Sequence, residues 1–371
     1  MSEDGGTIDR DLRLDACRGI ALWFIFVDHI PDNICSWLTL SHYGFSDTTE
    51  VFMFVSGVTC ALAYGAVQRA DGWWAVVSHT LRRGWEIYAA FLTLIIGLVV
   101  TVYWAGGDQL ADEVNVRVLL QQPAASLSHA AILQYRPVNT DVLPTFVLFH
   151  LLFAPLLWLL MKIPNATFAA SALLYALVQF YGWNLPQWPR NEWYFNPFAW
   201  QVLVVFGAWW VTGGRNRLRR LVTSRAIVGL AVAYLVFGLV IALSWSAKPL
   251  ETAIPPSLAS LIYPIDKSDL DPLRLLHFLA IAVLVAKFVP SDWRGLATPV
   301  LRGAVRCGEN SLEIYCLGVL LSLAAHVLLT RLSGGVAAQV AVSAVGILML
   351  VAFATLSTWI GIGSRRQPRL L

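Results

Sequence analysis

The chain alternates between long apolar stretches and short polar segments. Ten of the apolar stretches are long enough to cross ~30 Å of bilayer hydrocarbon as helices with some tilt. The pattern therefore predicts an all-α, polytopic membrane helical bundle with about ten transmembrane helices. The predicted spans are residues 17–36, 48–68, 84–105, 143–162, 165–182, 197–213, 225–246, 273–290, 311–330 and 335–362.

Composition indicates a chain that lies mostly within the membrane. Of its 371 residues, 57% are hydrophobic and 13% are charged, whereas about a quarter of a soluble domain is charged. The longest polar stretches, 106–142 and 247–272, are the size of loops. We therefore expect one integral membrane domain over residues 1–371. The five cysteines form no C-x-x-C pair, so neither a zinc site nor a disulfide framework is expected.

The basic residues predict an orientation. With the N-terminus in the cytoplasm, 19 of the 26 lysines and arginines fall on the cytoplasmic side of the ten spans, as the positive-inside rule requires. Both termini are then cytoplasmic, as expected for a multi-pass protein of a bacterial inner membrane. This distribution accounts for the net charge of +3 without nucleic-acid binding. The seven basic residues left outside are Arg117, Arg136, Arg190, Lys248, Lys267, Arg274 and Arg331.

One predicted outer loop, residues 181–200, is rich in aromatic side chains. Such rings form belts at membrane interfaces, and they also provide stacking platforms for sugar rings. The sequence leaves both interpretations open, and we take Trp193 as the candidate sugar-binding residue. The large aromatic residues of this loop include Trp183, Trp188, Trp193, Tyr194 and Trp200.

The first span carries ionisable groups at both ends. His29 follows Arg18 by eleven residues, close to three helical turns, so the two side chains share a face about 16 Å apart along the axis. Ionisable residues within a membrane mark function by default, and histidine suits proton transfer near neutral pH. Alternatively, Arg18 extends to lipid phosphates and His29 only caps the helix.

The residues around this pair resemble a known group of enzymes. The pattern RLDACRG followed by DH, with ten residues between Arg18 and His29, is similar to the acyltransferase-3 superfamily. Those membrane enzymes move acyl groups from cytoplasmic acyl-CoA to extracytoplasmic sugars. The segments FIFVDHIPDN, SWLTLSHYGFSDTTEVFMFVSG, FNPFAWQ and DKSDLDPLRLLHFLA more specifically resemble the OpgC family, predicted succinyltransferases of osmoregulated periplasmic glucans.

The resemblance implies roles for particular residues. His29 would be the base that deprotonates a sugar hydroxyl, or would carry the acyl group transiently. Asp28 or Asp32 would orient the imidazole, and Arg18 would steady CoA or the inner end of the span. Succinyl-CoA would be the donor substrate, with no bound cofactor, and a periplasmic glucan would be the acceptor.

Carboxylates at the outer starts of two other spans are further candidates. Glu50 opens the second span three residues after Asp47. It could share the mouth of a site with His29, or it could stabilise the helix N-terminus, where carboxylates are favoured. Asp141 precedes the fourth span on the same side and has the same two interpretations.

Arg274 and His277 lie at positions i and i+3 at the outer start of the eighth span, so they share a face. A succinyl group ends in a carboxylate, which arginine can hold bidentately. Arg274 is therefore the candidate for acyl-group selection. The alternative is an ion pair between Arg274 and Asp269 or Asp271.

Three classes of function remain open from the sequence. An acyltransferase uses the Arg18–His29 face, a proton-coupled transporter would show inverted repeats, and a glucan-binding scaffold would need only the aromatic loop. The sequence does not distinguish acetyl, succinyl and methylmalonyl donors, and it does not give the oligomeric state.

Overall fold

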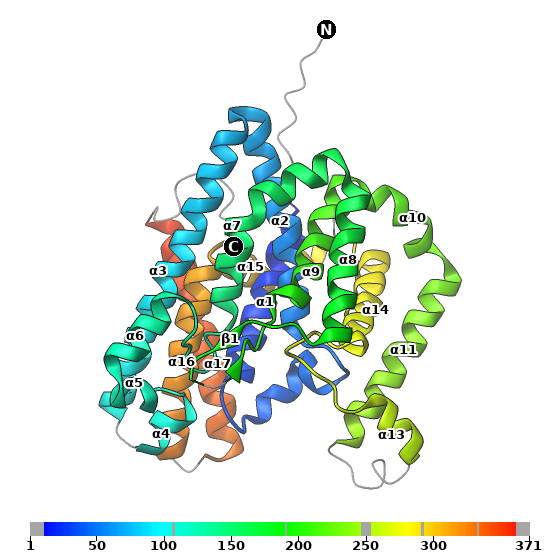
Figure 1. Cartoon of the computed structure of the whole chain (residues 1–371). Coiled ribbons are helices and arrows are strands. Elements are labelled where there is room, and N and C mark those ends of the chain that lie inside the picture. Colours follow the sequence, from blue (N-terminus) through cyan, green and yellow to red (C-terminus); the bar gives the residue numbers. More distant parts are fainter. Residues whose placement is uncertain are drawn as a thin grey trace.

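The computed structural model describes residues 11–105, 108–189, 191–245, 254–290, 293–331 and 334–360. Within them the chain is helical almost throughout, with one two-stranded antiparallel hairpin (Figure 1). A helix occupies each of the ten predicted spans. These helices are α1 (Leu12–Asp28), α2 (Thr48–Asp71), α3 (Trp73–Ala105), α7 (Val142–Lys162), α8 (Pro164–Tyr181), α9 (Pro197–Trp209), α11 (Arg225–Ser244), α14 (Pro272–Phe288), α16 (Ser311–Arg331) and α17 (Val336–Trp359).

Six of these helices are long and apolar enough to cross a membrane by themselves, namely α2, α3, α7, α11, α16 and α17. The other four, α1, α8, α9 and α14, are shorter or more polar. The all-helical membrane architecture is therefore confirmed, while the count of ten spans stays a prediction. Of the basic residues used to predict orientation, Arg10, Arg190, Lys248, Arg365, Arg366 and Arg369 lie outside the described residues.

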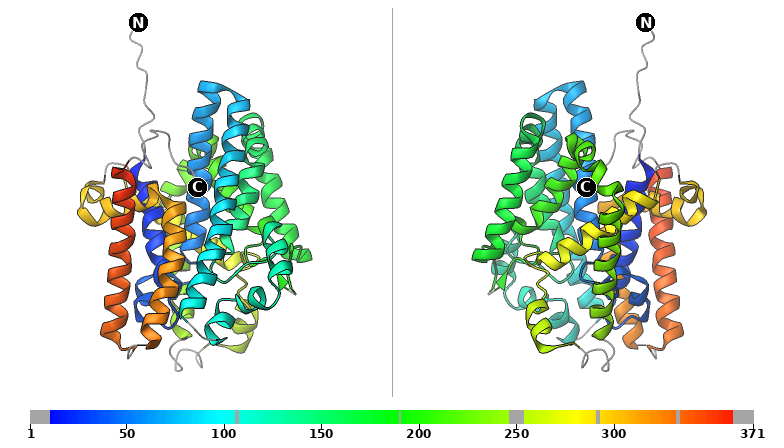
Figure 2. Two further views of the ribbon diagram at one scale, coloured as in Figure 1. Left: turned by 90° about the vertical axis from the view of Figure 1, so that its left-hand side faces the viewer. Right: turned by 90° about the vertical axis from the view of Figure 1, so that its right-hand side faces the viewer.

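Short elements join the long helices. At one end of the bundle are η1 (Ile34–Leu38), η2 (Leu40–His42), α4 (Asp108–Glu113), α5 (Arg117–Gln121), α6 (Pro123–Ala131), β1 (Pro186–Gln187), β2 (Asn191–Glu192) and α13 (Pro256–Ile262). At the other end are η3 (Trp210–Gly214), α10 (Arg215–Thr223), η4 (Arg294–Ala297) and α15 (Pro299–Glu309). The first residues of α1 and the last residues of α17 lie at this second end (Figure 2).

The first predicted span was wrong at its outer boundary. The helix stops at Asp28 instead of continuing to residue 36. Pro31 lacks the backbone N–H that a continuing helix needs, and Asp32 adopts a positive φ of 54°, which ends regular helix geometry. The chain then folds into η1 and η2, so residues that were assigned to the hydrocarbon instead shape one end of the bundle.

Glycines bring two pairs of helices into close contact. A Cβ atom on Gly19 of α1 would lie 1.8 Å from the carbonyl oxygen of Ala304 in α15. A Cβ atom on Gly57 of α2 would lie 2.0 Å from the carbonyl oxygen of Val204 in α9. Small residues allow membrane helices to pack backbone against backbone. These contacts fix α1 and α2, whose ends form the candidate site, against the rest of the bundle.

Candidate active site

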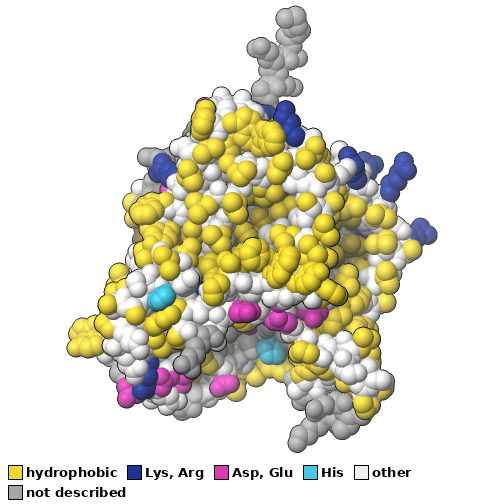
Figure 3. Space-filling view, viewed as in Figure 1, with side chains coloured by type: hydrophobic (Ala, Val, Ile, Leu, Met, Phe, Trp, Pro, Cys, Tyr) yellow, Lys and Arg dark blue, Asp and Glu magenta, His cyan; other side chains and the backbone are white. Residues whose placement is uncertain are grey.

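A cavity of about 1210 Å³ opens at the end of the bundle where α1 ends and α2 and α7 begin. Four of the residues predicted from the sequence line it, namely Asp28, His29, Asp32 and Asp141. The space-filling view shows a hollow with carboxylates beside it at this end, whereas most basic side chains visible on that face lie toward the other end (Figure 3). The cavity is therefore the candidate active site.

His29 stands directly after the last residue of α1, with its backbone N–H donating to the carbonyl oxygen of Ile25 at 3.0 Å. The side chain is half-buried, and its Nδ1 atom makes no hydrogen bond to any described residue. Burial, together with the nearby charge of Lys267, lowers the pKa of His29 to about 3. The imidazole is therefore neutral at neutral pH and has a lone pair that can accept a proton.

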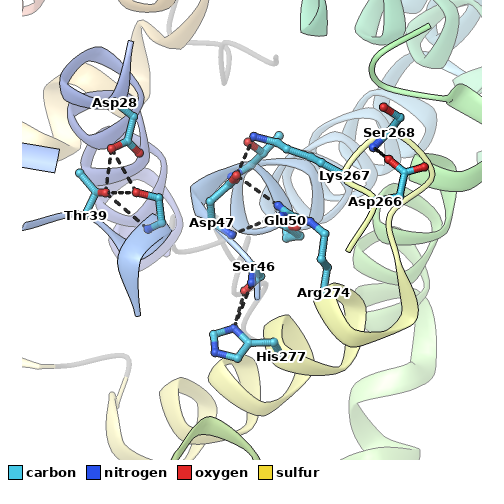
Figure 4. Close-up of polar contacts among 12 residues, drawn as sticks. Asp28, Thr39, Ser46, Asp47, Glu50, Asp266, Lys267, Ser268, Arg274 and His277 are labelled. Carbon is cyan, nitrogen blue, oxygen red and sulfur yellow. Dashed lines mark hydrogen bonds and ion pairs between the residues drawn. The ribbon is translucent and has the colours of Figure 1, made fainter. Parts of the chain in front are cut away.

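Asp28 contacts hydroxyl groups and not the imidazole of His29. Its Oδ1 atom accepts hydrogen bonds from Thr39 Oγ1 at 2.8 Å and from Ser41 Oγ at 3.3 Å (Figure 4). Asp32 is exposed at the turn that follows α1. Among the described residues neither carboxylate hydrogen-bonds His29, so the orienting role implied for them by the resemblance has no counterpart in this geometry.

A partly buried ion-pair network joins the start of α2 to α14 and to the loop before it (Figure 4). Lys267 Nζ lies 2.6 Å from Asp47 Oδ2, and Arg274 Nη2 lies 3.1 Å from the same oxygen. Arg274 Nη2 also lies 2.6 Å from Oε1 of Glu50, which is fully buried. Asp47 and Glu50 form a capping box that closes the N-terminus of α2. Arg274 is thus engaged by these two carboxylates and not by Asp269 or Asp271.

His277, one turn after Arg274, supports the wall of the cavity from behind. Its Nδ1 atom lies 2.7 Å from Ser46 Oγ. Glu50 and His277 do not line the main cavity, although both belong to the elements that position Asp47. We conclude that Glu50 and His277 hold the wall in place, while Asp47 itself faces the cavity.

Lys267 and Arg136 are cations of this cavity that the sequence identified only as outer basic residues. The Arg136 side chain is fully buried. Its Nη2 donates to Gln187 Oε1 at 2.7 Å, and its Nε and Nη1 atoms make no hydrogen bond to any described residue. Asp141 Oδ1 is 3.8 Å from Nε. Burial raises the pKa of Asp141 to about 6, although the charge of Arg136 opposes this.

The aromatic loop divides into two roles. Trp188 and Tyr194 line the cavity. Trp193 is only 3% exposed, and the guanidinium carbon of Arg136 lies 4.4 Å from the centre of its ring. Trp193 therefore packs behind Arg136 instead of offering its face to a ligand. Trp200 is fully buried and donates from Nε1 to the carbonyl oxygen of Ser268 at 3.0 Å.

Arg18 lies inside the protein, 1% exposed, and its Nη2 atom donates to Ser311 Oγ of α16 at 2.5 Å. It does not extend to lipid phosphates, which was the alternative interpretation. It also does not line the cavity, whereas Ile25, between Arg18 and His29 along α1, does. Arg18 thus connects α1 to α16 deeper in the bundle than the cavity.

Comparison with known families matches residues 10–362 to the model of the OpgC protein family. The chain belongs to the OpgC family. Membership in this family implies an acyltransferase-type enzyme, in agreement with the resemblance seen in the sequence. No curated protein and no solved structure matches the chain. No group of three or more His, Cys, Asp or Glu side chains that could hold a metal is found in the described part of this OpgC protein.

Proposed function

We propose that this OpgC protein is a membrane O-acyltransferase that moves a succinyl group from cytoplasmic succinyl-CoA to hydroxyl groups of periplasmic glucans. The observation that carries the proposal is His29, a neutral imidazole at the end of α1 that lines a large cavity. A thioester is already activated, so a positioned base and proximity suffice for transfer to a hydroxyl.

The distribution of basic residues supports an arrangement in which the acyl donor and the glucan acceptor approach from opposite sides of the membrane. If the ten long helices all cross the membrane, the end with α10 and α15 faces the cytoplasm, because Arg215, Arg217, Arg219, Arg220, Arg302 and Arg306 lie there. The cavity at the other end then faces the periplasm. The thioester would approach His29 through the bundle, and the glucan would enter the cavity directly.

The transfer itself balances without any further reactant. The oxygen of the glucan hydroxyl attacks the thioester carbonyl, and His29 takes the proton of that hydroxyl. The carbon–sulfur bond breaks, CoA leaves as a thiolate, and the proton on His29 returns to that sulfur. The products are an O-succinyl ester on the glucan and free CoA. A transient acyl-histidine is the alternative route, with the same overall balance.

Lys267 and Arg136 take the place of Arg274 as candidates for contact with the succinyl carboxylate, because both line the main cavity and Arg274 does not. Of the two, Arg136 has two guanidinium nitrogens, Nε and Nη1, with no hydrogen-bond partner among the described residues. A buried arginine with spare donors is suited to a carboxylate.

The acceptor side also fits a saccharide. The cavity combines carboxylates such as Asp28 and Glu192, which accept hydrogen bonds from hydroxyl groups, with the rings of Trp37, Trp188 and Tyr194. Pockets for small organic ligands commonly pair aromatic walls with a few polar groups that fix orientation.

The test is to replace His29 with glutamine and to measure transfer from succinyl-CoA to glucan in proteoliposomes, reading the charge of the glucan by anion exchange. We expect the rate to fall by about 10²–10⁴, the usual contribution of general acid–base catalysis. The control is His326→Gln, because His326 pairs with Glu113 at 3.0 Å and does not line the cavity. Unchanged succinylation in a correctly inserted His29→Gln variant contradicts the catalytic role of His29, and no transfer by the parent protein contradicts the proposed function itself.

A further inference from the structure

A second, smaller cavity of about 490 Å³ lies beside the main one. Ser41 and Asp47 line both cavities, so the segment from Ser41 to Asp47 forms the wall between them. The volume lies within the range of ~300–1,000 Å³ that is typical of pockets for small organic ligands. The two cavities are thus neighbouring parts of one end of the molecule.

Two aromatic rings stand at this smaller cavity in fixed positions. Trp245, directly after α11, donates from Nε1 to the hydroxyl oxygen of Tyr263, directly after α13, at 2.6 Å. Trp245 is 50% exposed and Tyr263 is 38% exposed. The hydrogen bond fixes the two rings relative to each other while leaving about half of the indole uncovered. Uncovered, oriented rings can pack against the apolar face of a ligand.

The rest of the cavity wall combines polar and charged groups with the apolar side chains of Phe45, Pro264 and Ile265. Asp47, Ser46 and Arg274 contribute carboxylate, hydroxyl and guanidinium groups. Asp47 and Arg274 pair with each other and Ser46 contacts His277, but carboxylate and hydroxyl oxygens have further lone pairs that can accept hydrogen bonds from the hydroxyl groups of a ligand. The combination of aromatic rings and hydrogen-bonding groups therefore favours a neutral, polyhydroxylated ligand.

The segment between the cavities is held from behind by α14. A Cβ atom on Gly44 would lie 1.9 Å from Nε2 of His277, so only glycine allows the segment to lie this close to α14. Ser46 contacts Nδ1 of the same histidine. Because Ser41 and Asp47 line both cavities, one extended polymer can contact both.

We propose that the smaller cavity is a second saccharide subsite, which binds a further sugar unit of the same glucan chain whose reacting hydroxyl lies at His29. This inference rests on the proposed function, because it names how the acceptor of that reaction is held. A second subsite makes the enzyme selective for polymeric acceptors, since only a chain long enough to pass the wall contacts both cavities.

The test compares a glucose disaccharide with a long glucan oligosaccharide as acceptors, with succinyl-CoA as donor. For Trp245→Ala we expect kcat/KM to fall about tenfold with the oligosaccharide, which corresponds to the loss of one good aromatic contact, and to stay unchanged with the disaccharide. Tyr263→Phe loses only the hydroxyl that holds Trp245. It should lower kcat/KM for the oligosaccharide relative to the disaccharide as well, by a smaller factor. It carries the test if Trp245→Ala does not fold.

The control is Trp183→Ala. Trp183 is similarly exposed (48%) and stacks on Tyr181, but it lines neither cavity. Equal loss with both acceptors, or no loss with either, overturns the second subsite. If the parent protein transfers no succinyl group to either acceptor in the same assay, the proposed function fails. If the parent protein is active while Trp245→Ala shows no dependence on acceptor length, only the subsite fails.

Discussion

The guanidinium of Arg274 lies 2.6 Å from the carboxylate of Glu50, a side chain with no exposed surface. These residues come from α14 and α2, and they meet at the wall that separates the two cavities. The carboxylates near Arg274 in sequence are occupied elsewhere: Asp269 accepts from Asn196 Nδ2 at 2.7 Å, and Asp271 caps α14. Arg274 therefore holds two helices together at the site.

Replacing Arg274 with methionine should destabilise the protein strongly. Glu50, which has no exposed surface, would lose its cation, and breaking a buried pair from one side typically costs about 3–5 kcal/mol. Denaturant unfolding in detergent measures the effect. The control is Arg117→Met, because Arg117 pairs with Asp112 at a partly exposed position, where a pair contributes about 1 kcal/mol or less. Full stability of Arg274→Met with altered acyl-donor preference would instead place Arg274 at the substrate.

Adding one methyl group at Gly19 or Gly57 should separate helices that now touch through their backbones. The new Cβ would lie about 2 Å from a carbonyl oxygen of α15 or α9, so the helices must move apart, and overpacking of this kind costs about 1–3 kcal/mol or more. Gly229→Ala in α11 is the matched control, because its Cβ would meet no atom within 4 Å. Melting temperatures in detergent compare the three variants, and equal values would contradict the close packing.

His29 should stay neutral over the whole physiological range. An ordinary histidine titrates near pH 6.5, whereas burial lowers the pKa of His29 to about 3. In NMR spectra of histidine-labelled protein, the imidazole signal that disappears in His29→Gln should therefore not shift between pH 5 and 8. A midpoint between pH 6 and 7 for that signal would contradict this burial, because a solvated histidine titrates there.

The arrangement of the helices was largely predictable because apolar stretches of membrane length are a local property of the sequence. Every predicted span contains a helix. The turn between the fourth and fifth spans is also where Lys162 and Pro164 indicate it. The main error concerned the end of α1. The predicted span followed the apolar residues as far as residue 36, although Pro31 disfavours a continuing helix. Proline and the strained backbone of Asp32 ended the helix eight residues before the predicted boundary at residue 36.

The site was predictable only where helix ends fix the position of a side chain. His29 and Asp141 flank helices directly, so their placement at one end followed from the spans. Arg136 and Lys267 belong to loops. The residues that they contact, Gln187 and Asp47 respectively, are distant in sequence. The direction of Trp193 was likewise set by its contact with Arg136, which no local pattern indicates.

Asp47 gives the most direct test of the ion-pair network, because its effect on stability depends on pH in a defined direction. Although burial opposes it, the cations of Lys267 and Arg274 hold the pKa of Asp47 well below its ordinary value of 3.8. The unfolded chain therefore binds more protons near and below pH 4, so stability rises with pH through that range. The contribution of Asp47 is complete above about pH 5 and is lost progressively as the pH falls.

Asp47→Asn should accordingly lower the melting temperature in detergent most at pH 7, where it removes the shared partner of two cations at a cost of roughly 3 kcal/mol. The gap between this variant and the parent should narrow as the pH is lowered from 5 toward 3. Asp32→Asn serves as the control, because Asp32 is exposed and forms no ion pair among the described residues. A gap that stays constant with pH would mean that Asp47 stabilises the wall through its cap hydrogen bond to Thr49 and not through its charge.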